Sequence, residues 1–163
     1  MAGLAVGARA PSFTLVGVDG KPYALAEALS GGPVLLAFFK TGCPACDLAA
    51  PYLARLAAAY AGGWQLWAIL QDPRAETAAY AQRFSLSFPV LADGDGYPIS
   101  RAYDPPATPS FYLVETDGSI AYASHGFSKE DINELSGLIA HHLGAERQVI
   151  APPDDGRPPF RPG

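Results

Sequence analysis

The chain has few of the residues that build metal centres or attach a protein to nucleic acids and membranes. It contains two cysteines and three histidines in 163 residues, and its 11 lysines and arginines against 16 aspartates and glutamates give a net charge of −5. It has no basic stripe, which argues against a nucleic acid or an anionic membrane surface as partner. No apolar stretch approaches the roughly 20 residues of a membrane-spanning helix. We therefore expect no nucleic-acid partner and no membrane span in this chain.

The length and the apolar content of 49% suffice for one well-buried domain without disulfide staples. Residues 1–10 carry a single Arg9 and no long apolar run, so they do not resemble a signal peptide. The sequence leaves two localisations open. The protein is cytoplasmic if Met1 is native, and periplasmic or otherwise extracytoplasmic if a leader has been removed.

The two cysteines, Cys43 and Cys46, enclose only Pro44 and Ala45 and closely follow the apolar run of residues 34–39. This pattern predicts a buried strand, a short turn and a helix that begins at Cys43. The free N–H groups and the dipole of a helix N-terminus stabilise a thiolate. A thiolate with a second thiol close by attacks disulfides, and the second thiol then resolves the mixed intermediate.

Other interpretations of the cysteine pair remain open but are less favoured. Structural zinc needs four ligands, whereas the chain has no second cysteine pair, and His125, His141 and His142 lack the spacing of a zinc finger. A purely structural disulfide across so short a loop would restrain little chain entropy. Two inert buried thiols are the remaining alternative. We therefore favour redox chemistry and expect no metal site.

The expected order of elements is typical of a mixed sheet with helices on both faces. It comprises an N-terminal hairpin (12–25), a strand (34–39), a helix (44–60), a strand (64–70), a helix capped by Asp72 (to 84), a short extended piece (89–91), a hairpin (110–115 and 119–124) and a final helix after Ser128 (to 143). This domain is expected to span residues 1–147. Residues 148–163 contain five prolines and are expected to form an extended or disordered tail.

Several short motifs occur in the order and spacing of a known family. They are Ala10-Pro11-Ser12-Phe13, residues 38–46, Pro51, residues 88–93, Ala102-Tyr103-Asp104 and residues 108–114. Together they resemble the TlpA/ResA-type thiol-disulfide oxidoreductases of the redoxin and AhpC/TSA grouping. The resemblance covers about residues 6–143. It implies an α/β, thioredoxin-like fold, in which helices flank a mixed central sheet and an N-terminal β-hairpin is added.

The resemblance also implies a role for each matched residue. Cys43 is the attacking thiol and Cys46 the resolving thiol in exchange with a protein disulfide or dithiol partner, with no cofactor beyond this pair. Pro109 is the cis-proline that faces the cysteines. The substrate-binding positions are Gly42, Pro44, Ala45, Thr108, Pro109 and Gly126. We expect the protein to be a monomer.

Three positions depart from the family pattern. Ala37 stands where thioredoxins carry a buried aspartate, Ala49 where ResA-like proteins carry a glutamate, and Gly42 where the family usually has tryptophan. The acid that normally exchanges a proton with the resolving thiol is therefore missing, and Asp47 or Glu115 are the candidate substitutes. We expect slower or differently tuned thiol exchange.

The main rival is a peroxiredoxin-like thiol peroxidase that uses Cys43 as its peroxidatic cysteine. Such a site needs a proline and a threonine at fixed spacing before the cysteine, and an arginine near the thiolate. Here Thr41 is one residue too close, the upstream proline is absent, and the arginine position aligns with Pro109. Copper delivery of the Sco type is disfavoured by the cysteine spacing and by the lack of histidine in residues 104–109. A further alternative is a thioredoxin-like interaction module that binds through its tail.

Overall fold

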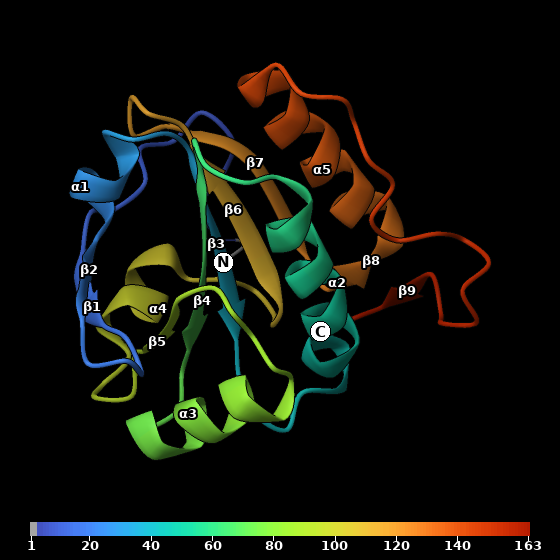
Figure 1. Ribbon diagram of the computed structural model, residues 1–163. Coiled ribbons are helices and arrows are strands. Elements are labelled where there is room, and N and C mark those ends of the chain that lie inside the picture. Colours follow the sequence, from blue (N-terminus) through green and yellow to red (C-terminus); the bar gives the residue numbers. More distant parts are fainter. Residues whose placement is uncertain (1–2) are drawn as a thin grey trace.

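The computed structural model describes residues 3–163. Strands and helices alternate in the first two thirds of the chain, and the last long helix is followed by an ordered tail (Figure 1). The elements are β1 (Thr14–Val16), β2 (Pro22–Ala24), α1 (Leu25–Leu29), β3 (Val34–Phe39), α2 (Pro44–Ala59), β4 (Gln65–Leu70), α3 (Arg74–Arg83), β5 (Val90–Ala92), α4 (Pro98–Tyr103), β6 (Ser110–Val114), β7 (Ile120–His125), β8 (Phe127–Ser128), α5 (Lys129–Leu143) and β9 (Phe160–Arg161).

The central sheet has the strand order β5-β4-β3-β6-β7. Strand β3 pairs in parallel with β4, and β4 in parallel with β5, whereas β6 runs antiparallel to both β3 and β7. Strands β1 and β2 form a separate antiparallel hairpin. The mixed sheet and the N-terminal hairpin predicted from the sequence are thus confirmed.

Each face of the sheet carries its own apolar core. One core lies under α2, α3 and α5, and it includes both cysteines. The other lies under α1, α4 and the N-terminal segment. Figure 1 shows α2 and α5 on one side of the sheet and α1 and α4 on the other. Every residue of β3 is buried, because alternate side chains enter opposite cores: Phe38 enters one and Phe39 the other.

The tail follows the seam between α2 and α5 instead of leaving the domain. Ile150 and Ala151 are buried and belong to the same core as the cysteines. Near the end of the chain, β9 pairs with β8 in an antiparallel ladder. The proline-rich composition of the tail did not suggest that it packs into the core.

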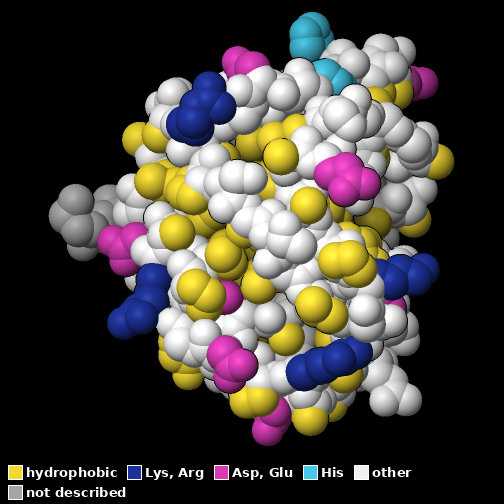
Figure 2. Space-filling view, turned by 90° about the vertical axis from the view of Figure 1, so that its left-hand side faces the viewer, with side chains coloured by type: hydrophobic (Ala, Val, Ile, Leu, Met, Phe, Trp, Pro, Cys, Tyr) yellow, Lys and Arg dark blue, Asp and Glu magenta, His cyan; other side chains and the backbone are white. Residues whose placement is uncertain are grey.

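Figure 2 shows the flank of the molecule on the side of β1, β2 and α1, where acidic, basic and hydrophobic side chains are interspersed. The basic side chains on this face stand apart from one another, in keeping with the net charge of −5. Within residues 3–163, no helix combines the length and the apolar character needed to cross a bilayer.

Candidate active site

The cysteine pair lies where β3 passes through a short turn into α2. Cys43 is the N-cap residue of α2, and its sulfur accepts a hydrogen bond from the backbone N–H of Cys46 at 3.3 Å. Pro44 occupies the first helical turn, where its missing N–H costs nothing. Both sulfurs are free thiols, with Cys43 5% exposed and Cys46 fully buried. The predicted strand, turn and helix around the pair are confirmed.

The turn before β6 brings Thr108 and Pro109 against Cys43. The Cys43 thiol donates to the carbonyl oxygen of Thr108 at 3.3 Å, and the Thr108 hydroxyl donates to the Cys43 sulfur at 3.5 Å. The Thr108–Pro109 peptide bond is cis, as the resemblance implies. Two segments 65 residues apart in the sequence therefore meet at the Cys43 sulfur.

Burial is the main influence on the pKa of Cys46. It raises the pKa of this thiol, and the hydrogen bond with Cys43 raises it further. The two positions that lack the family's acids, Ala37 and Ala49, are both fully buried in the same core. Neither methyl group can accept the proton of Cys46, and the thiol is the favoured form at neutral pH.

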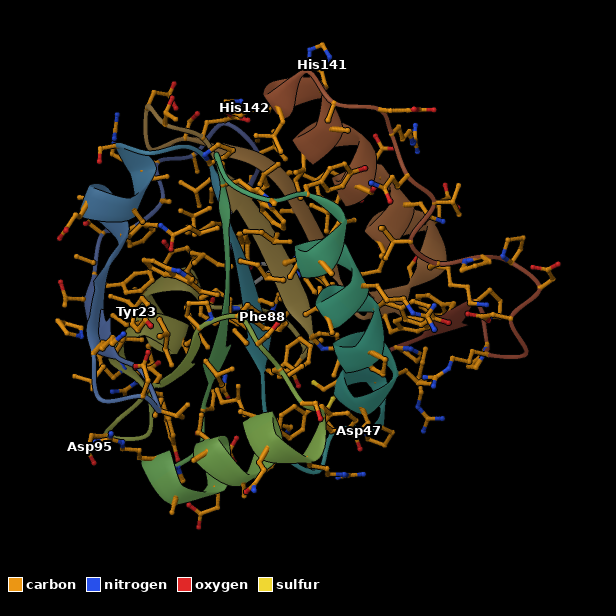
Figure 3. All side chains as sticks on the ribbon, viewed as in Figure 1. Tyr23, Asp47, Phe88, Asp95, His141 and His142 are labelled. Carbon is orange, nitrogen blue, oxygen red and sulfur yellow. The ribbon has the colours of Figure 1, made fainter. Side chains whose placement is uncertain are left out.

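Asp47 and Glu115, the candidate substitutes for this acid, lie in different parts of the molecule. Asp47 is in the first turn of α2 (Figure 3). It accepts a hydrogen bond from Tyr80 at 3.1 Å and lies 3.8 Å from Arg83. Burial raises the pKa of Tyr80, and the charge of Asp47 raises it further, so this hydroxyl stays protonated.

Glu115 follows the end of β6 that pairs with the start of β3, whereas the cysteines follow the end of β3. It lies 3.8 Å from His142 instead. The hypothesis that Glu115 replaces the missing acid is therefore wrong, because the two strands are antiparallel. Figure 3 shows His141 and His142 at the opposite end of the molecule from Asp47.

Asp72 belongs to this site, although the sequence suggested a different role for it. Its carboxylate accepts hydrogen bonds from the backbone N–H of Thr41 at 2.9 Å and from the Thr41 hydroxyl at 2.7 Å. The predicted helix cap at Asp72 is wrong, because α3 begins one residue later than predicted and its N-cap is Pro73. One signal was present in the sequence: Thr41 and Asp72 follow neighbouring parallel strands, whose carboxyl ends share one edge of the sheet.

His125 stabilises the turn that carries Pro109. Its Nδ1 lies 2.8 Å from the hydroxyl of Ser110, and that hydroxyl donates to the carbonyl of Ala107 at 2.6 Å. Burial lowers the pKa of His125, so the neutral ring is favoured. These contacts of His125 reach the turn of residues 107–110 and not the Cys43 sulfur itself.

The remaining predicted positions surround the cysteines. Gly42 has a positive φ of 75°, and a side chain there would meet no atom within 4 Å, so the surface before Cys43 is open. Pro44 is exposed and Ala45 is buried. Gly126 has a φ of 81° and donates to the carbonyl of Pro109 at 2.8 Å, which places it beside the cis-proline. Across residues 3–163, no three side chains of His, Cys, Asp or Glu are grouped to hold a metal ion.

A dithiol at a helix N-terminus facing a cis-proline in this fold defines the class of thioredoxin-like redox proteins. The ResA thiol-disulfide oxidoreductase of Geobacillus thermodenitrificans is 30% identical over 134 residues, covering 80% of this chain and 76% of the relative. Among solved structures, a Chlorobium tepidum protein assigned as the thiol:disulfide interchange protein DsbE superposes with a TM-score of 0.77 at 27% identity, covering 86% of this chain and 99% of that chain.

A secreted Mycobacterium tuberculosis disulfide oxidoreductase, homologous to E. coli DsbE, superposes with a TM-score of 0.65 at 28% identity, covering 79% of this chain and 95% of that chain. The AhpC/TSA family model matches residues 6–123. The chain belongs to the AhpC/TSA family and, within it, is a thioredoxin-fold thiol-disulfide oxidoreductase similar to ResA.

Proposed function

We propose that this oxidoreductase exchanges its Cys43–Cys46 pair with a disulfide or dithiol of a protein partner, with Cys43 attacking and Cys46 resolving. The observation that carries the proposal is the position of Cys43. Its sulfur lies at the start of α2 and receives hydrogen bonds from a backbone N–H and from the Thr108 hydroxyl. These donors suit a sulfur that becomes negatively charged.

The exchange proceeds in two displacement steps. The Cys43 thiolate attacks one sulfur of the partner disulfide, so a Cys43–partner disulfide forms and the other partner sulfur leaves as a thiolate. The Cys46 thiolate then attacks the Cys43 sulfur, which forms the Cys43–Cys46 disulfide and releases the second partner thiolate. Two electrons pass to the partner. With an oxidised pair and a reduced partner the same steps run in reverse.

The second step requires Cys46 to lose its proton. Burial raises the pKa of this thiol, and the alanines at 37 and 49 provide no acceptor. We therefore expect resolution of the mixed disulfide to limit turnover at neutral pH and to accelerate as the pH rises. Gly42, Pro44, Ala45, Thr108, Pro109 and Gly126 surround Cys43 or the cis-proline and are the positions expected to contact the partner.

Trapping the mixed disulfide tests this proposal. The Cys46→Ser variant, reduced and mixed with insulin, should accumulate a covalent protein–insulin adduct that dithiothreitol cleaves, visible by mass spectrometry of the intact protein. The Cys43→Ser variant is the matched control and should form little adduct. Equal adduct formation by both variants, or none by either, would contradict the assignment of the attacking thiol.

A redox titration of the pair would decide the direction of the reaction. A reduction potential near that of thioredoxin, about −270 mV, supports a reductase, and a value close to that of DsbA, about −120 mV, supports an oxidant. The monomeric state that we propose is checked by sedimentation of the reduced and the oxidised protein.

A further inference from the structure

The tail of the chain returns to the active site after passing along the seam between α2 and α5. At the far end of the seam, the Gln148 N–H donates to the Tyr60 hydroxyl at 2.8 Å. Asn133 then binds Ile150 and Ala151 through three hydrogen bonds of 2.9 to 3.0 Å. In Figure 1 the chain descends along α5 and its C-terminus lies close to the beginning of α2, where the cysteines are. The tail thus connects the two ends of the domain.

A buried lysine anchors the middle of the tail. The Nζ of Lys129 donates to the carbonyls of Pro152 and Arg157, each at 2.9 Å, and to the Asp155 carboxylate at 2.6 Å. Lys129 is 4% exposed, so these tail groups satisfy an ammonium that would otherwise be buried without partners. Asp155 also accepts a hydrogen bond from Tyr52. The hydrogen bonds to Lys129 and Tyr52 hold the pKa of Asp155 below its usual range.

Past this anchor the chain lies against the surface formed by Thr108, Pro109 and Gly126 beside the cis-proline, which we call the substrate groove. The Lys129 N–H donates to the carbonyl of Pro159 at 2.9 Å, and Phe160 and Arg161 pair with Ser128 and Phe127. A side chain at Gly126 would lie 3.2 Å from the carbonyl oxygen of Arg161. The tail backbone therefore packs directly on the glycine that lines this groove.

The last residue reaches the acceptor of the Cys43 hydrogen bond. A side chain at Gly163 would lie 2.3 Å from the Thr108 carbonyl oxygen and 2.7 Å from the Ala107 side chain. Residues 160–163 consequently occupy the surface on which an extended partner segment would pair with Thr108. Phe160, at the rim, is 58% exposed although it is large and apolar.

We propose that residues 160–163 are a specificity-determining occupant of the substrate groove: they favour small disulfides and admit an extended protein segment only when it displaces them. This inference rests on the proposed exchange function. A small disulfide needs only access to the sulfur of Cys43. A protein segment that pairs with Thr108 needs the backbone space that the tail fills, so the same tail slows one substrate class and not the other.

The test is a full-length variant in which Phe160, Arg161 and Pro162 are all replaced by glycine. It keeps the Lys129 and Asn133 anchors but weakens β9, because glycine loses the most conformational freedom on ordering. Insulin reduction is expected to rise about five-fold. This is the effect expected if the tail, which competes with insulin for the groove, binds more weakly by roughly one net hydrogen bond. Reduction of the small disulfide 5,5′-dithiobis(2-nitrobenzoate) is expected to stay unchanged. The control, Val149→Ser, changes an exposed tail residue outside the groove and should leave both rates at the parent value.

A synthetic peptide with the sequence of residues 157–163 provides the converse test. Added to the triple-glycine variant, it should return the insulin rate toward that of the parent and leave the small-disulfide rate unaffected. An insulin rate that is equal in parent and variant, or lower in the variant, would overturn the inference. If both proteins still exchange with the small disulfide, the proposed function stays intact. Loss of exchange with both substrates in the parent would overturn the function itself, and the inference with it.

Hydrogen exchange gives a readout that does not depend on rates. In the Cys46→Ser variant held as a mixed disulfide with a peptide, the amides of Phe160, Arg161 and Gly163 should exchange faster than in the free protein, because the bound peptide has displaced them. Unchanged protection in the adduct would contradict displacement.

Discussion

Cys46 shows how burial controls the reactivity of a side chain. Its pKa is raised mainly by desolvation. In the Cys43→Ala variant, the rate of Cys46 alkylation by iodoacetamide should therefore be slow at neutral pH and rise about ten-fold per pH unit through pH 9, because the thiolate fraction grows with no plateau below the pKa. Rates measured by mass spectrometry between about pH 6 and pH 9 check this slope.

The control for this prediction is the same variant in denaturant, where the Cys46 thiol regains its ordinary pKa. Its alkylation rate should then level off near pH 9. A folded protein whose rate also levels off below pH 9 would show that a nearby group lowers the pKa of Cys46.

Asp72 holds the turn that leads into the cysteine pair through its two hydrogen bonds to Thr41. The Asp72→Ala variant should lose about 1–3 kcal/mol of unfolding free energy, because it leaves the Thr41 donors unpaired. It should also reduce insulin more slowly, since the start of α2 is less firmly placed. Asp72→Asn keeps one acceptor and should fall between parent and alanine in both urea unfolding and activity. Equal stability of all three proteins would count against this role.

At the scale of single residues, the sequence predicted the parts of the site that local pattern encodes. Cys43 and Cys46 follow a buried strand, and Pro109 occupies a recognisable motif. The partnership of Asp72 with Thr41 was missed, because an aspartate before a proline also fits a helix cap. Glu115 was misplaced because its distance from Cys46 depends on the antiparallel pairing of β3 and β6, which single residues do not reveal.

Among the elements, α5 contributes more than a cover for the sheet. Asn133 on this helix binds the tail through its side chain. In the Asn133→Ala variant, residues 148–151 should exchange amide hydrogens at least ten-fold faster, a loss of about 1.4 kcal/mol or more of local protection. Glu134→Gln alters an exposed neighbour on the same helix and should leave the exchange unchanged. Equal protection in both variants would show that burial of Ile150, not the Asn133 contacts, holds the tail.

The elements themselves followed closely from hydrophobic periodicity and turn residues. The central strands, the three longer helices and both hairpins lie where the sequence predicts them, to within one or two residues at their ends. The last helix begins directly after Ser128, which caps it through the N–H of Asp131. The packing of the tail against the domain did not follow from hydrophobic periodicity or turn residues. Only Ile150 and Ala151 in it are buried apolar residues, and the groups that bind it come from the C-terminal end of α2 and from α5, which are distant in the sequence. Short, proline-rich segments carry no periodic signal for such contacts.

For the molecule as a whole, the choice between disulfide exchange and peroxide reduction depends on what surrounds the Cys43 sulfur. Its hydrogen bonds come from Cys46 and Thr108, and Pro109 aligns with the arginine position of peroxiredoxins. The reduced protein should therefore consume hydrogen peroxide far more slowly than it reduces insulin. A coupled assay with dithiothreitol as reductant measures both rates. Peroxide turnover equal to or faster than insulin reduction would favour the peroxidase alternative.

The attachment of the tail to its own domain has a quantitative consequence. A tethered strand meets its groove at a local concentration fixed by the geometry of one molecule, whereas a strand supplied by a second copy meets it at a concentration that falls on dilution. Any restraint that β9 imposes on large substrates should therefore persist unchanged from micromolar to nanomolar protein. The partner concentration at which the enzyme begins to exchange disulfides with proteins would then depend on the affinity of that partner and not on the enzyme concentration.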